Sequence, residues 1–221
     1  SEALAAVGST SALINVFTNL FIGVSLGTNV LAARFYASGR EKEMSETVHT
    51  SLTFALISGI VMSFVGLFCS RGALELMTTP EDVIGQAALY MKIYFLGMPF
   101  FMLYNYGAAV LRAVGDTKRP LYFLVVSGIL NAGLNMAIAT VISQMVSCIL
   151  VLHCLYHCEG SYQLRFSKLT IKKQYLKPIF QVGIPAGIQS TVINFSNVLL
   201  QSSVNSFGSI AMAGYTAANN I

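Results

Sequence analysis

Long runs with almost no charge constrain this chain more than any other feature. Residues 3–35 contain one charged side chain, Arg34, and residues 48–68 contain none. Each run reaches the length of about 20 residues that a helix needs to cross the hydrocarbon core of a bilayer. Charged residues make up only 10% of the chain, whereas soluble domains carry about 25%. Because backbone groups in lipid must pair within the protein, we expect an all-α, polytopic transmembrane helical bundle.

The loops between the apolar runs alternate in charge. Basic residues dominate at 34–42, 112–119 and 165–177, whereas the loop at 71–82 holds three acids and one arginine. Short basic loops stay in the cytoplasm, so we place residues 34–47, 112–119 and 165–177 inside the cell and residues 71–82 outside. This topology predicts a multi-pass protein of the plasma membrane. Further spans are expected at 84–111, from 121, at 179–207 and from 211.

Two basic regions on the same side of the membrane require an even number of crossings between residues 120 and 158. About 39 residues hold two helices only if the connecting turn is very short. Asn131, Gly133 and Asn135 are the turn formers in this segment, so both helices are expected to be short. An alternative is one span followed by a re-entrant piece.

A polar island, LRAVGDTKRP at residues 111–120, separates two of the apolar runs. Gly115 and Asp116 are turn formers, and Asp116 or Thr117 can cap the following helix. Pro120 suits the first turn of that helix, where its missing N–H would have no partner. Arg112 is the first of the basic residues in this island. The sequence therefore predicts a tight cytoplasmic turn between two spans.

The island also carries a family resemblance. It closely resembles the "RA-G-T--P" loop of the multidrug and toxic compound extrusion (MATE) transporters. TPEDV at 79–83, GIPAGIQS at 183–190 and NSFGSIAMAGYTAANNI at 205–221 resemble three further landmarks of that family, in the same order. The resemblance implies a fragment of a two-lobe MATE-like transporter that contains about helices 2 to 7 and the start of helix 8.

This resemblance implies a division of the chain into three parts. Residues 1–160 are expected to form an N-terminal lobe that lacks its first helix. Residues 161–178 would be a basic cytoplasmic connector, and residues 179–221 the start of a C-terminal lobe. The segment near 136–137 is too short for the helix entry and external loop of the family. We therefore expect an internal deletion of roughly one to two dozen residues there, judged from the length that a span requires.

Amides recur at helical spacing within the span at 179–207. Asn194, Asn197 and Gln201 share one face with Ser190 and Asn205, and lipid would not tolerate such a face. The face either lines a cavity that binds substrate or forms hydrogen bonds between helices. Gly183 and Pro185 near the start of this helix indicate a bend. A sparser amide pattern, Asn15 and Asn19, occurs in the first span, so the predicted cavity residues are Asn15, Asn19, Asn194, Asn197 and Gln201.

The sequence contains no recognisable catalytic or nucleotide-binding motif, so we expect neither an enzyme nor an ATP-driven pump. The segment HCLYHC at 153–158 has metal-ligating residue types, but no second ligand segment accompanies it, so we assign no metal site and no cofactor. No acid lies deep in a span. A site for a coupling Na⁺ or H⁺ is therefore expected outside this stretch of the chain.

The function that the resemblance implies is secondary active transport. The protein would export cationic or amphipathic drugs and toxic compounds in exchange for Na⁺ or H⁺, by alternating access. Its partners would be a small-molecule substrate and the lipid bilayer, without nucleic acid, and the complete protein would be monomeric. Two alternatives remain open: a lipid-linked sugar flippase of the same superfamily and a non-transporting membrane scaffold.

Overall fold

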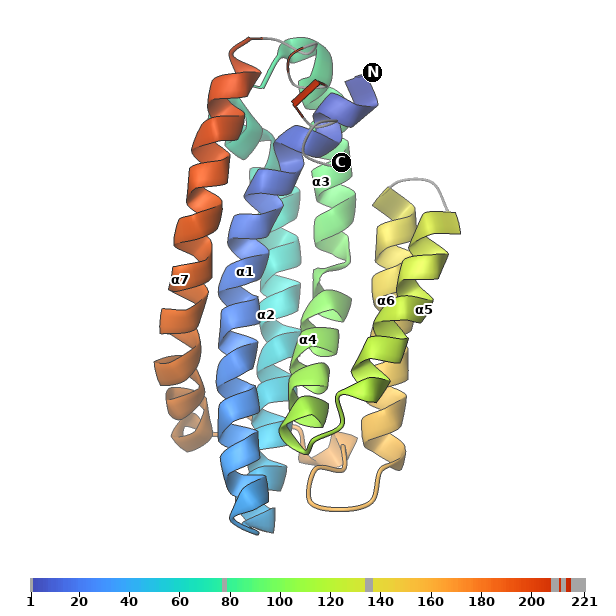
Figure 1. Ribbon diagram of the computed structural model, residues 1–221, viewed down its shortest axis with the longest axis vertical. Coiled ribbons are helices and arrows are strands. Elements are labelled where there is room, and N and C mark those ends of the chain that lie inside the picture. Colours follow the sequence, from blue (N-terminus) through green and yellow to red (C-terminus); the bar gives the residue numbers. More distant parts are fainter. Residues whose placement is uncertain (1, 77–78, 134–136, 208–210, 212–213, 216–221) are drawn as a thin grey trace.

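The chain folds into a bundle of long helices, as the computed structural model in Figure 1 shows. The structure describes residues 2–76, 79–133, 137–207, 211, 214 and 215, and these residues contain helices and turns but no strand. The elements are α1 (Glu2–Ala37), α2 (Glu41–Leu76), α3 (Glu81–Leu96), α4 (Met98–Ala113), α5 (Lys118–Gly133), α6 (Ala137–His157), the 3-10 turn η1 (Phe166–Lys168) and α7 (Lys173–Asn205).

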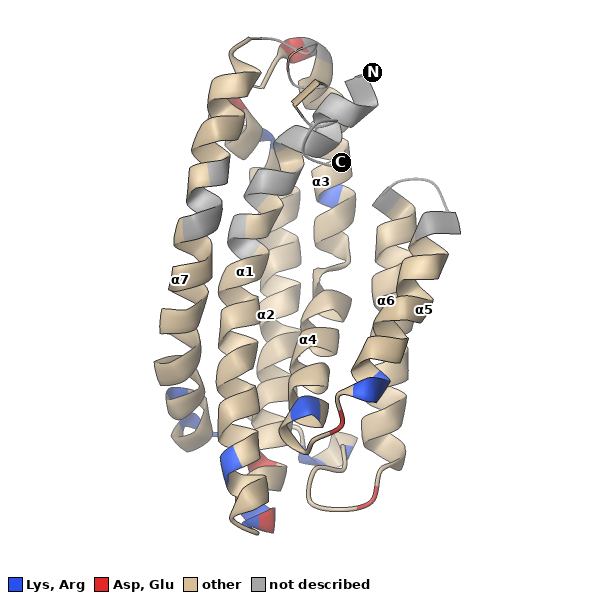
Figure 2. Cartoon of the chain, viewed as in Figure 1, with Lys and Arg blue, Asp and Glu red and all other residues tan. Residues whose placement is uncertain are grey.

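Three helices contain segments long and apolar enough to cross a membrane: Thr18–Ala37, Glu41–Leu76 and Ile138–His157. A bent pair, Val83–Leu96 with Met98–Ala113, can form a fourth span. The basic segments at 34–42, 112–119 and 165–177 all lie at one end of the bundle, and the acidic loop after α2 lies at the other (Figures 1 and 2). The arrangement therefore agrees with the alternating topology predicted from charge.

The third span is not the continuous helix that the sequence predicted over 84–111. α3 and α4 meet at Gly97 with a bend of 47°. Pro99 has no N–H to offer the carbonyl of Phe95, four residues earlier, so the helical hydrogen bond is missing at this point. Ser63 of α2 supplies the replacement, because its hydroxyl donates to the Phe95 carbonyl at 2.7 Å. A neighbouring helix thus donates to the carbonyl that Pro99 cannot serve.

The segment between 118 and 157 forms two helices, as predicted, of which α6 contains a segment long and apolar enough to cross a membrane. α5 has only 16 residues, which corresponds to a length of about 24 Å at 1.5 Å per residue. Asn131 near its end donates from Nδ2 to the hydroxyls of Thr140 and Ser143 of α6, both at 3.5 Å. The predicted turn residue Asn135 and the start of the expected deletion at 136 lie outside the described residues.

The tight turn between α4 and α5 is built as its sequence predicts. Gly115 adopts a φ of +89°, which a residue with a side chain rarely adopts. The N–H of Asp116 donates to the Leu111 carbonyl at 3.0 Å, and that of Gly115 to the Arg112 carbonyl at 3.1 Å, which closes the end of α4. Oδ1 of Asp116 accepts from the Arg119 N–H at 3.1 Å. Asp116, rather than Thr117, is therefore the residue that caps α5.

The first and the last described helices, α1 and α7, are in direct backbone contact. Each helix carries a G-x-x-x-G segment, at 23–27 and 183–187, and the two segments face one another. A Cβ added at Gly23 would collide with the backbone of Gly187, and one at Gly27 with the backbone of Ile179. A Cβ on Gly187 would likewise lie 2.6 Å from the Leu20 carbonyl oxygen. Small residues of this kind let membrane helices approach closely enough for dispersion contacts along their backbones.

Replacing Gly187 with leucine should separate α1 from α7. The added side chain has no space, so we expect a loss of at least about 2 kcal/mol of stability, seen as a lower melting temperature in detergent. Gly72→Leu is the matched control, because no atom lies within 4 Å of a Cβ at that position. An equal loss of stability in both variants would contradict the role of the glycine contact.

The predicted topology can be tested by labelling single cysteines in a background without the four native cysteines. Ser38 and Glu81 are both exposed and lie at opposite ends of the bundle. A membrane-impermeant thiol reagent should label Ser38→Cys only from the cytoplasmic side and Glu81→Cys only from the external side. Labelling of both variants from one side would show that the charge pattern does not set the orientation.

Candidate functional site

A cavity of about 450 Å³ lies between α4, α5 and α6, with one residue of α1 at its edge. We call it the polar pocket, because most of its lining residues carry a hydroxyl, amide or guanidinium group. Its lining residues are Ile22, Phe101, Tyr104, Asn105, Arg112, Leu124, Ser127, Gly128, Asn131, Thr140, Ser143, Gln144 and Ser147.

Most polar side chains of this pocket are held by local hydrogen bonds. Nδ2 of Asn105 donates to the Phe101 carbonyl at 2.8 Å, and the Tyr104 hydroxyl donates to the Pro120 carbonyl at 2.9 Å. Gln144 differs, because its Oε1 is buried without a hydrogen-bond partner among the described residues. This oxygen lies beside Gly97, at the bend between α3 and α4. A buried acceptor without a partner has the capacity to accept a hydrogen bond from a ligand.

The electrostatic character of the polar pocket is nearly neutral. Arg112, from the α4–α5 turn, is the one charged residue among those that line it, and no carboxylate does. Amides and hydroxyls offer both donors and acceptors without fixing a charge in the membrane. The pocket can therefore hydrogen-bond a neutral or amphipathic molecule, but it supplies no counter-ion for a cation.

Two predicted cavity residues of α1, Asn15 and Asn19, are not among the residues that line the polar pocket, and their lining of a substrate cavity stays a prediction. Asn15 is exposed, and Asn19 donates from Nδ2 to the Asn15 carbonyl at 2.7 Å. Ile22, one turn further along the same face, lines the polar pocket. Asn29 lies further along α1 and has a packing role, because its Nδ2 donates to the Ala109 carbonyl of α4 at 2.9 Å.

The predicted amide stripe of α7 is only partly described. Gln201 is buried, with 4% of its surface exposed, and its Nε2 donates to Oδ1 of Asn205 at 2.9 Å. This hydrogen bond joins two residues of α7 and is not a bond between helices. The side chains of Asn194 and Asn197 lie outside the described residues. Their lining of a substrate cavity stays a prediction, as does that of Gln201.

The two residues predicted to bend α7 lie within one continuous helix. α7 runs from Lys173 to Asn205 with Pro178 and Pro185 inside it. Gly183 belongs to the contact with α1, since a Cβ there would lie 2.5 Å from the Cα of Val24. A bend at Gly183 and Pro185 therefore stays a prediction, whereas the packing role of Gly183 follows from the structure.

The sequence reasoning missed the residues of α4 and α6 that define the polar pocket. On α6, Thr140, Ser143, Gln144 and Ser147 recur at helical spacing, which is the same signal that drew attention to α7. The segment HCLYHC also lies near the cytoplasmic end of α6, where the rings of His153 and His157 are 4.2 Å apart. Within the described part of the chain, no group of three or more His, Cys, Asp or Glu residues could hold a metal ion.

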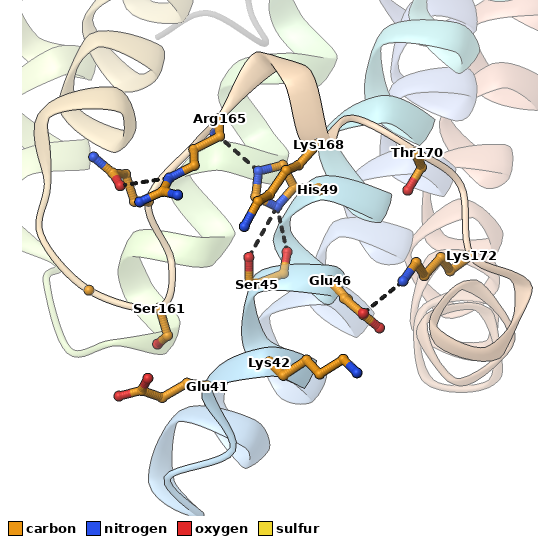
Figure 3. Close-up of a pocket in the computed structure, with 12 residues that line it drawn as sticks. Glu41, Lys42, Ser45, Glu46, His49, Ser161, Arg165, Lys168, Thr170 and Lys172 are labelled. Atoms are coloured by element: carbon orange, nitrogen blue, oxygen red, sulfur yellow. Dashed lines mark hydrogen bonds and ion pairs between the residues drawn. The ribbon is translucent and has the colours of Figure 1, made fainter.

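The predicted connector is fastened to the cytoplasmic end of α2 (Figure 3). His49 is buried, and its Nδ1–H donates to the Ser45 carbonyl at 2.6 Å while its Nε2 accepts from the Arg165 N–H at 3.0 Å. Seven residues further along the connector, the Lys172 N–H donates to the Thr50 hydroxyl at 3.3 Å. We call these contacts, together with the ion pair described next, the connector latch.

An ion pair completes the connector latch. Nζ of Lys172 lies 2.7 Å from Oε1 of Glu46. Hydrogen bonds from Lys172 and then from Tyr175 lower the pKa of the Glu46 carboxyl below its ordinary value of 4.5. A lowered pKa in the folded state means that the pair stabilises the fold above the ordinary pKa of the carboxyl and loses its effect as the pH falls through the lowered value.

Acidification should therefore weaken the connector latch, and Glu46→Gln should remove this pH dependence. We expect the melting temperature of the chain to fall between pH 6 and pH 3.5, and to fall less in Glu46→Gln, as followed by circular dichroism. Glu75→Gln is the control, because Glu75 forms an exposed ion pair with Arg71 at the opposite end of the bundle. An identical pH response in the parent and in Glu46→Gln would contradict the assignment.

Comparison with known proteins adds independent observations. A model of the MatE family matches residues 1–137 of this chain. The probable multidrug resistance protein YoeA of Bacillus subtilis (strain 168) is 31% identical over 242 residues, which cover 100% of this chain and 52% of YoeA. The probable multidrug resistance protein YpnP of the same organism is 28% identical, with coverage of 100% and 52%. The chain thus spans about half the length of these curated relatives.

The fold also matches solved structures. A structure described as the inward-facing conformation of a multidrug resistance MATE family transporter of the MOP superfamily superposes with a TM-score of 0.91. The sequences are 21% identical, and the superposition covers 99% of this chain and 53% of that chain. At this level of identity, the likeness establishes the fold: an all-α bundle of the MATE type.

Proposed function

Because this chain belongs to the MatE family of multi-pass membrane transporters, which are not enzymes, we propose that it contributes to secondary active export of drugs and toxic compounds. The substrates would be cationic or amphipathic, and export would be driven by exchange for Na⁺ or H⁺. Support for a small-molecule substrate comes from the relatives YoeA and YpnP, both named as probable multidrug resistance proteins.

The polar pocket is the observation that carries this proposal. A cavity of about 450 Å³ is within the range of sites that hold drug-sized ligands, and its amides and hydroxyls lie between membrane helices. Polar groups at this depth are costly unless they have partners or contact water or a ligand. Gln144 offers a buried oxygen that has no partner among the described residues. We propose that this pocket forms part of the substrate passage.

Alternating access requires elements that can change their relative position. The bend between α3 and α4 at Gly97 lies directly beside Gln144, so a change in the bend would alter the wall of the polar pocket. We further propose that residues 1–160 and 179–221 belong to two lobes connected by residues 161–178. The glycine contact between α1 and α7 would then be a contact between the lobes that brings their backbones close together.

The coupling ion would bind outside the polar pocket, because no carboxylate lines this pocket. The proposed deletion near 136–137 has support from length alone: the alignment with YoeA extends over 242 positions, more than the 221 residues of this chain. We propose that the protein acts as a monomer. Neither a sugar flippase nor a scaffold is favoured, because Arg112 is the one cation in the polar pocket and a phosphate-bearing sugar would require more.

The test is efflux of an uncharged amphipathic fluorescent dye from vesicles. The host should be a transporter as long as the curated relatives that contains these 221 residues. Gln144→Leu removes the buried acceptor, so dye efflux should fall about five-fold, the equivalent of one hydrogen bond worth about 1 kcal/mol. The amide of Gln144 also forms a hydrogen bond with the Tyr94 side chain, so the melting temperature should fall by no more than the loss of that one bond produces.

The matched control is Gln86→Leu, which makes the same replacement at an exposed position outside the polar pocket. It should leave efflux unchanged. Normal efflux in Gln144→Leu would exclude the polar pocket from the passage. A drop in melting temperature in proportion to the loss of efflux would instead assign Gln144 to helix packing.

A further inference from the structure

A second and larger cavity, of about 700 Å³, opens between the first turns of α2 and the connector. We call it the cytoplasmic pocket, and Figure 3 shows its labelled side chains around His49. It is separate from the polar pocket, since the two share no lining residue. The lining residues are Glu41, Lys42, Ser45, Glu46, His49, Gly160, Ser161, Gln163, Arg165, Lys168, Thr170 and Lys172.

The walls of this pocket are built by the connector latch. His49 is 2% exposed and accepts the Arg165 N–H, so the backbone of the connector is held against α2 at this point. The contacts of Lys172 with Thr50 and Glu46 hold the other end of the connector. The cavity is therefore enclosed by residues more than 100 positions apart in the sequence, with both walls fixed by hydrogen bonds.

The charge of the cytoplasmic pocket is predominantly positive. Four cations and two carboxylates line it, but Glu46 already pairs with Lys172 at 2.7 Å. Arg165 donates from Nε to Oε1 of Gln163 at 3.1 Å, which leaves its terminal N–H groups available. Lys42 and Lys168 form no ion pair within the described part of the chain. Three of the four lining cations, Lys42, Lys168 and Arg165, thus form no ion pair among the described residues, against one such carboxylate, Glu41.

Hydroxyl groups complement these cations. Ser45, Ser161 and Thr170 also line the pocket and can donate hydrogen bonds to an oxygen-rich anion. Ammonium, guanidinium and hydroxyl donors around one cavity are the set that proteins use to bind phosphate. A carboxylate ligand would use fewer of these donors, because it presents two oxygens rather than the three or four of a phosphate.

The surroundings of the pocket match the interface of a bilayer. The connector alternates cations with apolar residues, and Phe166 and Ile171 are 60% and 40% exposed. Tyr156 of α6 lies against Phe166, with ring centroids 5.8 Å apart. This end of the bundle is the cytoplasmic end by the positive-inside rule, where anionic lipid headgroups attract basic segments.

We infer that the cytoplasmic pocket binds a phosphate group through Lys42, Lys168 and Arg165. The phosphate is that of an anionic phospholipid of the inner leaflet or a soluble phosphate, because both present negatively charged phosphate oxygens to the same donors. Bound phosphate draws α2 and the connector together, so it stabilises the connector latch. This inference does not depend on transport, since it concerns binding to the cytoplasmic end of the bundle alone.

The test measures binding of defined probes to the purified chain by native mass spectrometry. The probes are phosphatidylglycerol, phosphatidylcholine and inorganic phosphate. Phosphatidylglycerol should bind about ten-fold more tightly than phosphatidylcholine, because the choline cation neutralises the charge of a phosphate that is otherwise the same. Removing both lysines, in Lys42→Gln with Lys168→Gln, should weaken binding of phosphatidylglycerol about 25-fold, at roughly five-fold for each cation near an anionic headgroup. Competition by millimolar inorganic phosphate would identify a soluble phosphate as the ligand instead of a lipid.

Two further variants are controls for misfolding and for non-specific electrostatic attraction. Lys118→Gln with Lys177→Gln removes the same charge from exposed cytoplasmic positions outside the pocket, and should weaken binding less than two-fold. Glu41→Gln removes the remaining carboxylate and should tighten binding, a change that misfolding cannot produce. Equal affinity for the two lipids without competition by phosphate would overturn the inference. Equal losses in the two double variants would overturn it as well.

Discussion

The contact between α1 and α7 is the interaction on which the arrangement of this bundle depends. In water, apolar faces drive helices together, but lipid tails are as apolar as leucine, so membrane helices need close packing instead. Glycines at 23, 27, 183 and 187 provide it, because any Cβ at these positions would meet the opposite backbone. The contact fixes α7 against the first helix of the chain. The connector that precedes α7 is then close enough to α2 to form the connector latch.

Hydrogen bonding within the bundle follows the same constraint. Hydroxyls such as Thr18 and Thr53 donate to carbonyls one turn earlier in their own helix, which hides them from lipid at little cost. Where a helix is interrupted, a neighbour supplies the missing donor, as Ser63 does for the Phe95 carbonyl. Gln144 is an exception, and it lies in the polar pocket. Its Oε1 has no hydrogen-bond partner among the described residues and lies beside Gly97, at the bend between α3 and α4.

The two cavities differ in chemistry because they lie at different depths. The polar pocket is built from amides and hydroxyls, since a buried charge among membrane helices would be costly without a partner. The cytoplasmic pocket lies at the aqueous end of the bundle and holds four cations, which water and headgroups can solvate. One is suited to neutral and amphipathic molecules, the other to phosphate. The two cavities share no lining residue, so both can exist in one chain.

The sequence by itself determined the helical class, the alternation of loops and the turn at 115–116, because these depend on local physics. The length of an apolar run determines whether it can span the membrane, and the charge of a loop determines on which side of the membrane it lies. A glycine with positive φ followed by an aspartate forms a turn. Only the tertiary structure decided the break at Gly97, since Pro99 is tolerated in many membrane helices and needs Ser63 beside it. It alone decided the polar pocket, whose residues come from four helices. It also revealed that Gly183 serves packing, because a G-x-x-x-G segment acquires meaning only when a second one faces it.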